Sequence, residues 1–160
     1  YYMTMTLDDG VARVSRETGE MTWRMATAAG DFMTHEPAGV FSRPHSVQPL
    51  DGSVLVFNRG NPSGGGPACS QAAEVAYDLD KRQMETIWSY SPGSCITVEW
   101  LGSAQRLPNG NTLACFSSAG RMDEVDENGE IVMSFTLPAG SAFGFAVRAD
   151  EPVGSIPRRP

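Results

Sequence analysis

Residues 46–57 read Ser-Val-Gln-Pro-Leu-Asp-Gly-Ser-Val-Leu-Val-Phe, and residues 103–116 read Ser-Ala-Gln-Arg-Leu-Pro-Asn-Gly-Asn-Thr-Leu-Ala-Cys-Phe. Each passage is an apolar run, a turn centred on glycine and a second apolar run, and the later passage has one residue more on each side of the turn glycine. This pattern is typical of a tight antiparallel hairpin. Its recurrence indicates a repeat architecture.

A second motif alternates with the first and occurs three times, within residues 11–23, 75–90 and 122–135. Each copy again predicts a hairpin, because two alternating apolar runs flank a short polar turn. A large side chain stands at the same place in each copy, where we expect it to fill the wedge between neighbouring sheets. These side chains are Trp23, Trp88 and Met133.

Together the two motifs predict an all-β fold, a partial β-propeller of four-stranded antiparallel blades. One hairpin of each kind makes a unit of roughly 40 to 45 residues, the size of one blade. Two complete blades fit, over residues 45–90 and 101–136, and residues 1–25 would belong to a preceding blade. In the remaining region, 137–160, residues 143–149 would form the inner strand of a following blade, before a Pro-rich tail expected to be extended or disordered. Because a closed propeller needs at least four blades, we expect a further segment or a second chain to complete the ring.

Composition narrows the possible partners of the chain. It has 160 residues, with 17 glycines, 11 prolines and a formal net charge of −7, and its basic residues are scattered. Nucleic acid is disfavoured because neutralising its backbone needs a clustered basic face. No apolar run is long enough to span a membrane as a helix. Residues 71–77 are the nearest helical candidate, and they equally fit the entry to a strand.

The cysteines leave two interpretations open. Cys69 and Cys95 lie in loops rich in Gly, Ser and Pro, and Cys115 lies in a predicted strand. Their spacing is not that of a metal site. A disulfide between Cys69 and Cys95 would indicate a secreted, periplasmic or organelle-lumenal protein, whereas three unpaired cysteines would carry no such information. The chain opens on Tyr1 without an initiator Met or a signal-peptide pattern, so we expect a processed chain or a fragment of a longer polypeptide.

The ordered set of motifs resembles the arylsulfotransferase family of bacterial and algal propeller proteins. The resemblance rests on residues 18–24, 45–50, 56–61, 102–113 and 124–132. It implies a six-bladed propeller that moves a sulfuryl group from a phenolic sulfate to a phenolic acceptor without a nucleotide donor or another cofactor. In such a site a channel histidine is transiently sulfated, and further histidines and an arginine hold the sulfate oxygens.

Three residues are candidates for this chemistry. His45 resembles the channel histidine, because it immediately precedes the first hairpin motif. Arg59, at the end of that hairpin, is the candidate sulfate clamp, and Asn58 beside it could donate a hydrogen bond. Imidazole is nucleophilic near neutral pH, and cationic donors stabilise the charge on the sulfuryl oxygens. The alternatives are an ordinary loop histidine and an arginine that caps a turn.

The sequence also departs from the family pattern. In the second hairpin motif Gly102 stands where the first has His45, and the only other histidine, His35, lies in a Thr-His-Glu-Pro loop. The remaining histidines of a family-type site would have to come from elsewhere. Two functions therefore stay open: an arylsulfotransferase-like enzyme, or a non-catalytic propeller that serves as a structural or protein-binding subunit of a larger assembly.

Overall fold

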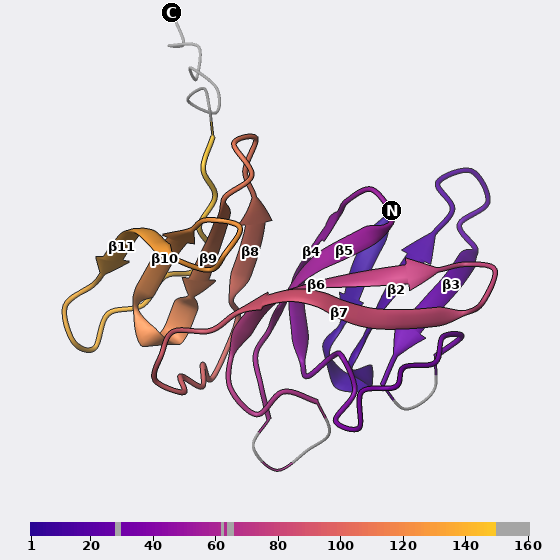
Figure 1. Ribbon diagram of the computed structural model, residues 1–160, viewed down its shortest axis with the longest axis horizontal. Coiled ribbons are helices and arrows are strands. Elements are labelled where there is room, and N and C mark those ends of the chain that lie inside the picture. The colour runs from indigo at the N-terminus through magenta and orange to yellow at the C-terminus, as the bar shows by residue number, and fades with distance from the viewer. Residues whose placement is uncertain (28–29, 62, 64–65, 150–160) are drawn as a thin grey trace, which may run out of the picture.

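The strands assemble into three antiparallel sheets that follow one another along the chain (Figure 1). The computed structural model describes residues 1–27, 30–61, 63 and 66–149. Within these residues the helical structure consists of two short 3-10 turns, η1 (Thr6–Asp8) and η2 (Ser117–Ala119). The predicted all-β fold with four-stranded antiparallel sheets is confirmed, and the arrangement is consistent with part of a propeller.

Each sheet is a meander of consecutive strands. The N-terminal sheet contains β1 (Tyr2–Met5), β2 (Gly10–Val14) and β3 (Met21–Ala26). The middle sheet contains β4 (Pro44–Pro49), β5 (Ser53–Asn58), β6 (Gln71–Asp78) and β7 (Gln83–Tyr90). The C-terminal sheet contains β8 (Ser103–Arg106), β9 (Thr112–Phe116), β10 (Arg121–Val125) and β11 (Ile131–Thr136). Residues 71–77, left open between helix and strand, belong to strand β6.

Two glycines make the hairpin turns of the repeated motif. Gly52 joins β4 to β5 with φ of 72°, and Gly110 joins β8 to β9 with φ of 90°. Glycine adopts this left-handed conformation without the steric cost that a side chain brings. Both hairpins therefore form from local sequence, as predicted.

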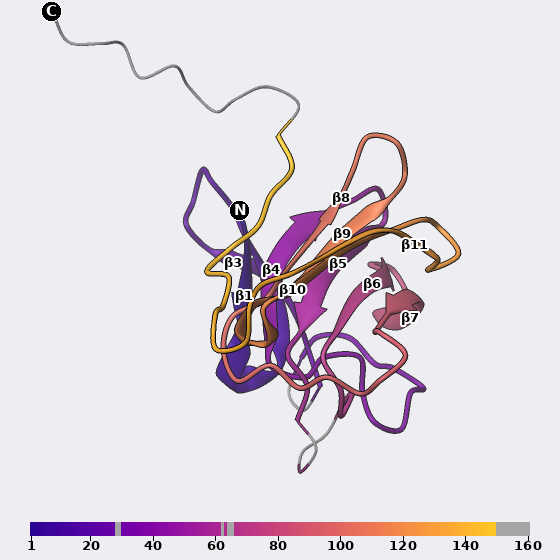
Figure 2. The same cartoon turned by 90° about the vertical axis from the view of Figure 1, so that its left-hand side faces the viewer.

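Viewed along the row of sheets, the strands of the three sheets lie one behind another (Figure 2). Two apolar cores join the sheets, one between the N-terminal and middle sheets and one between the middle and C-terminal sheets. Strand β5 is buried on both faces because successive side chains of a strand point to opposite sides. Val54 and Val56 join the core between the N-terminal and middle sheets, and Leu55 and Phe57 join the core between the middle and C-terminal sheets. The first strand of the middle sheet, β4, contacts both β1 and β8. His45 therefore lies on the strand where all three sheets meet.

The three large side chains that were predicted to fill the spaces between neighbouring sheets differ in how deeply they are buried. Trp23 is only 4% exposed and packs against Tyr77 of the middle sheet, with 5.3 Å between the ring centroids. Trp88 is half-buried against the core between the middle and C-terminal sheets, and the Arg106 guanidinium lies 5.0 Å from the centre of its ring. Met133 is 39% exposed. Trp23 and Trp88 therefore fill spaces between sheets, as predicted, whereas Met133 is partly exposed in the described structure.

Cys69 and Cys95 form a disulfide, which settles the alternative left open by the sequence, and Cys115 is free and buried.

No helix among the described residues is long and apolar enough to cross a membrane. Residues 143–149 form no hydrogen-bonded ladder, although side chains of the C-terminal sheet hold them in place. Most of the Pro-rich tail, residues 150–160, lies outside the described part of the chain.

Candidate functional site

His45 and Arg59 meet at one end of the β4–β5 hairpin. His45 is paired with Phe57 across the ladder, and a bulge at Ser46, with φ of 54°, re-aims the strand directly after it. Arg59 follows β5, and its backbone N–H donates to the carbonyl of Arg43 at 3.3 Å. The hairpin register thus gathers one imidazole and two guanidinium side chains at the same place.

The three side chains form a positively charged cluster. Burial lowers the pKa of His45, and the nearby Arg59 lowers it further. Burial also lowers the pKa of Arg59, with a second contribution from Arg43. Within the described residues neither guanidinium forms an ion pair with a carboxylate. Two guanidinium groups held near one another favour binding of an anion.

Two polar atoms of the cluster are buried without a hydrogen-bond partner among the residues that the structure describes. They are Nε2 of His45 and Nε of Arg59, and Oγ of the neighbouring Ser42 is a third such atom. Buried polar groups are nearly always satisfied, so exceptions that gather at one place mark a position where a water, an ion or a ligand would bind. The unpartnered atoms belong to an imidazole and a guanidinium, and the guanidinium is a cationic donor that suits an anion.

Two separate parts of the chain hold the backbone of the cluster in place. On one side, a carboxylate oxygen of Asp9 accepts a hydrogen bond from the Arg43 backbone N–H, so the N-terminal sheet holds this residue. On the other side, Ser70 donates its hydroxyl to the carbonyl of Arg59 and accepts from the backbone N–H of Val98 at 2.8 Å. Ser70 directly follows Cys69, so the disulfide loop stabilises the backbone at Arg59.

Both polar atoms of the Asn58 side-chain amide form hydrogen bonds with backbone groups. Its Nδ2 donates to the carbonyl of Val40 at 2.9 Å, and its Oδ1 accepts from the N–H of Ser42 at 3.1 Å. The side chain is fully buried. These contacts position the segment that leads to Arg43, and direct contact between Asn58 and a substrate stays a prediction.

Comparison with known proteins places this geometry in a family. The family model described as Arylsulfotransferase (ASST) matches residues 9–137, which is most of the chain and includes His45 and Arg59. The chain belongs to the arylsulfotransferase family. A search of curated proteins finds no match.

In this arylsulfotransferase-family chain the structure leaves no room for a side chain at Gly102, the position of the second hairpin motif that corresponds to His45. Gly102 has φ of 116°, and a Cβ at this position would lie 2.2 Å from the ring of Phe57. Phe57 is the ladder partner of His45, so the ring occupies the place that a side chain at residue 102 would need. The second hairpin motif therefore cannot present an imidazole as the first does.

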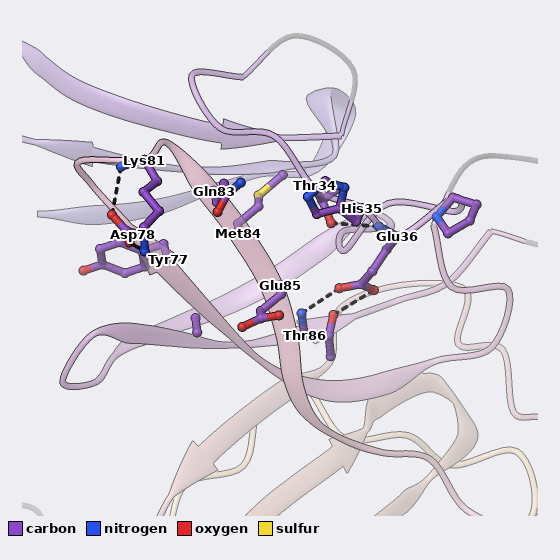
Figure 3. Close-up of a pocket in the computed structure, with 12 residues that line it drawn as sticks. Thr34, His35, Glu36, Tyr77, Asp78, Lys81, Gln83, Met84, Glu85 and Thr86 are labelled. Atoms are coloured by element: carbon purple, nitrogen blue, oxygen red, sulfur yellow. Dashed lines mark hydrogen bonds and ion pairs between the residues drawn. The ribbon is translucent and has the colours of Figure 1, made fainter.

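His35, the other histidine, lies apart from the cluster. It is exposed and lines an open pocket of about 550 Å³ beside the β6–β7 hairpin (Figure 3). Glu36 next to it accepts hydrogen bonds from the N–H and hydroxyl of Thr86, at 2.6 and 3.1 Å, and Met33 pairs with Gln83. The loop around His35 therefore covers the free edge of β7, which protects an edge strand from pairing with another chain.

Arg43 is the site residue that sequence reasoning missed. Its position two residues before His45 is the only local signal, because its approach to Arg59 depends on the pairing of β4 with β5.

No group of three His, Cys, Asp or Glu side chains suited to a metal ion occurs in the described part of the family domain.

Proposed function

We propose that the chain provides a sulfuryl-transfer site in which His45 accepts the sulfuryl group of an aryl sulfate and passes it to a phenol. The observation that carries this proposal is an imidazole nitrogen that has no hydrogen-bond partner among the described residues and lies beside two guanidinium groups that form no ion pair there. Family membership supports the reaction class. The disulfide is compatible with an oxidising, exported setting, which we propose as the location.

The residues of the cluster fit the two half-reactions. A lowered pKa keeps His45 neutral near pH 7, so the lone pair of Nε2 can attack sulfur. The N–S bond forms as the S–O bond to the aryl group breaks, and the phenolate leaves with the bonding pair. The oxygen of an acceptor phenol then attacks the same sulfur, the N–S bond breaks, and the acceptor proton passes to solvent.

The arginines supply charge for this transfer. Guanidinium groups of Arg59 and Arg43 would donate hydrogen bonds to the sulfuryl oxygens in both steps. Nε2 of His45 is covered in this structure, so the groups over it must shift to admit the donor. A sulfuryl oxygen would then satisfy the orphaned Nε of Arg59.

Turnover of a chromogenic aryl sulfate with a phenol acceptor tests the proposal on the full chain. His45→Ala should abolish product formation, and Arg59→Met should lower it by about 10²-fold or more, the usual effect of losing one oxyanion donor. His35→Ala is the matched control and should leave the rate unchanged, because this exposed histidine lies outside the cluster. Equal rates for wild type and His45→Ala would remove His45 from the mechanism. A folded wild type without any turnover would favour the non-catalytic subunit.

A further inference from the structure

A series of hydrogen bonds runs from the N-terminal sheet to the C-terminal sheet through the backbone of Arg43 and Arg59. The N–H of Thr27, directly after β3, donates to the carbonyl of Asp9 at 3.0 Å, and the Asp9 carboxylate accepts from the Arg43 N–H. The Arg43 carbonyl accepts from the Arg59 N–H at 3.3 Å. Beyond Arg59, Ser70 continues the series to the segment that leads into β8. The two arginines of the cluster are therefore the middle members of this series.

The backbone at Arg43 is in a conformation that needs such support. Its φ is 50°, in the left-handed region that residues with a side chain rarely adopt. The following residue is Pro44, and a proline disfavours the right-handed helical conformation for the residue before it. Unusual backbone conformations persist only where the surrounding structure holds them. At Arg43 the hydrogen bonds to Asp9 and from Arg59 provide this hold on both sides of the residue.

The η1 turn makes a second contact with the same segment. The Thr6 hydroxyl donates to the carbonyl of Pro44 at 3.0 Å, and His45 follows directly. Asp9 is itself fixed, because its carbonyl is bound by Thr27. The turn thus presents the Asp9 carboxylate from a rigid backbone and fixes the chain as it enters the residue that carries the imidazole.

Comparison with the C-terminal sheet shows that the fold accepts glycine where Asp9 stands. Strands β1 and β2 are joined by η1 and left-handed Asp9, just as β9 and β10 are joined by η2 and left-handed Gly120. The η2 turn also contacts the segment that follows its sheet, through the backbone: the Phe143 N–H donates to the Ser117 carbonyl at 3.1 Å. Glycine adopts the left-handed conformation at the least cost. The carboxylate of Asp9 is therefore an addition to this turn, and it stands at the turn that holds Arg43.

We propose that Asp9 is a positioning residue of the candidate site: its carboxylate fixes the backbone at Arg43 and so holds the Arg43 guanidinium beside Arg59 and His45. Asp9 contacts backbone and acts on an anion through Arg43. Misplacing a group of a reactive site by about 1 Å can cost about 10²-fold in rate. The effect of Asp9 on sulfuryl transfer rests on the proposed function, whereas its hold on the Arg43 backbone does not.

Amide hydrogen exchange on the full chain, followed by NMR without substrate, tests the hold on the backbone. Asp9→Ala should speed exchange of the Arg43 N–H by about 10-fold, because the acceptor of its hydrogen bond is lost. Asp9→Asn keeps an acceptor oxygen and should keep the protection. Asp8→Ala is the matched control, since Asp8 is the exposed neighbour in η1. Unchanged exchange at Arg43 in Asp9→Ala, or an equal acceleration throughout β9 and β10, would overturn the proposal.

Turnover of the chromogenic aryl sulfate by single and double variants tests whether Asp9 acts through Arg43. Arg43→Met should lower kcat/KM by about 10²-fold, and Asp9→Ala by up to about the same factor, while Asp9→Asn should stay near wild type. The double variant Asp9→Ala/Arg43→Met should be no slower than Arg43→Met alone, because the group that Asp9 positions is already gone.

Two results separate this proposal from the proposed function. Losses that multiply in the double variant would show that Asp9 acts independently of Arg43, which contradicts the positioning role and leaves sulfuryl transfer intact. A wild type that transfers no sulfuryl group would contradict the proposed function, and hydrogen exchange at the Arg43 N–H would still decide whether Asp9 holds this residue.

Discussion

His45 acquires its chemistry from the residues that pack around it. Its own strand contributes only the bulge that follows, whereas burial and Arg59 together lower its pKa. A neutral imidazole is the reactive form for attack on sulfur.

The stability of the chain depends on the same lowered pKa of His45. Between the lowered pKa and the ordinary value of about 6.5, the unfolded chain binds more protons at this residue than the native chain. The His45 contribution to stability is therefore complete above about pH 6.5 and is lost as the pH falls through that window.

Arg59→Met should raise the pKa of His45 toward its ordinary value without restoring it fully, because burial is the larger cause of the shift. An NMR titration of the imidazole resonances measures this directly. Arg24→Met, at an arginine of the N-terminal sheet that does not shift His45, is the control and should leave the titration unchanged. An identical pKa in wild type and Arg59→Met would mean that the two charges do not interact.

Gly102→Ala should destabilise the chain by about 1–3 kcal/mol or more, because the new Cβ meets the Phe57 ring and the backbone has a positive φ. Urea unfolding gives the difference in free energy. Gly93→Ala is the matched control, since nothing lies within 4 Å of a Cβ built there, and it should change stability by less than about 1 kcal/mol. Equal stability of the two variants would show that residue 102 tolerates a side chain.

At the scale of elements, polar contacts connect the sheets alongside the apolar cores, and a disulfide joins the loops before β6 and after β7. The hydroxyl of Tyr90, at the end of β7, donates to Asp123 of β10 at 2.8 Å. Asp123 is fully buried and also accepts from Arg121 and Ser134. Burial raises the pKa of Tyr90 to about 12, and the Asp123 carboxylate contributes to the shift.

Tyr90→Phe should cost about 1–3 kcal/mol of stability, since it removes one partner from a buried carboxylate. Denaturant unfolding of Tyr90→Phe, Asp123→Asn and the double variant forms a cycle that isolates the pair. The two substitutions should be coupled. Strict additivity would show that the hydroxyl and the carboxylate act independently.

Removing the disulfide with Cys69→Ser/Cys95→Ser should lower stability by about 2–4 kcal/mol, because the bond closes a loop between residues 26 apart. The backbone at Arg59 should also loosen, since Ser70 links it to this loop. Thermal unfolding with and without reductant provides the control: wild type should respond to reductant and the variant should not. A variant as stable as the oxidised wild type would contradict this role.

Elements formed by local pairing could be predicted from the sequence, and features set by contacts between sheets could not. The hairpins around Gly52 and Gly110 follow from alternation and turn chemistry. The His45 and Arg59 pair follows from the repeat and the family resemblance. The approach of Arg43, the hydrogen bond that Gln48 accepts from the next sheet and the steric block at Gly102 arise only where separate strands and sheets meet.

On the scale of the whole molecule, a chain with a net charge of −7 brings two positively charged arginines together beside His45, at the strand of the middle sheet that contacts both other sheets. Local positive charge in a chain of negative net charge favours anion binding at this place.

The most direct test is to trap the sulfuryl group on the full chain. The protein is incubated with an aryl sulfate without a phenol acceptor, quenched and digested, and the peptides are analysed by mass spectrometry. The predicted result is one added sulfuryl group on the peptide that contains His45, which persists in His35→Ala and is lost in His45→Ala. Release of the phenol with no sulfuryl group on that peptide, or with the group on another residue, would contradict transfer through His45.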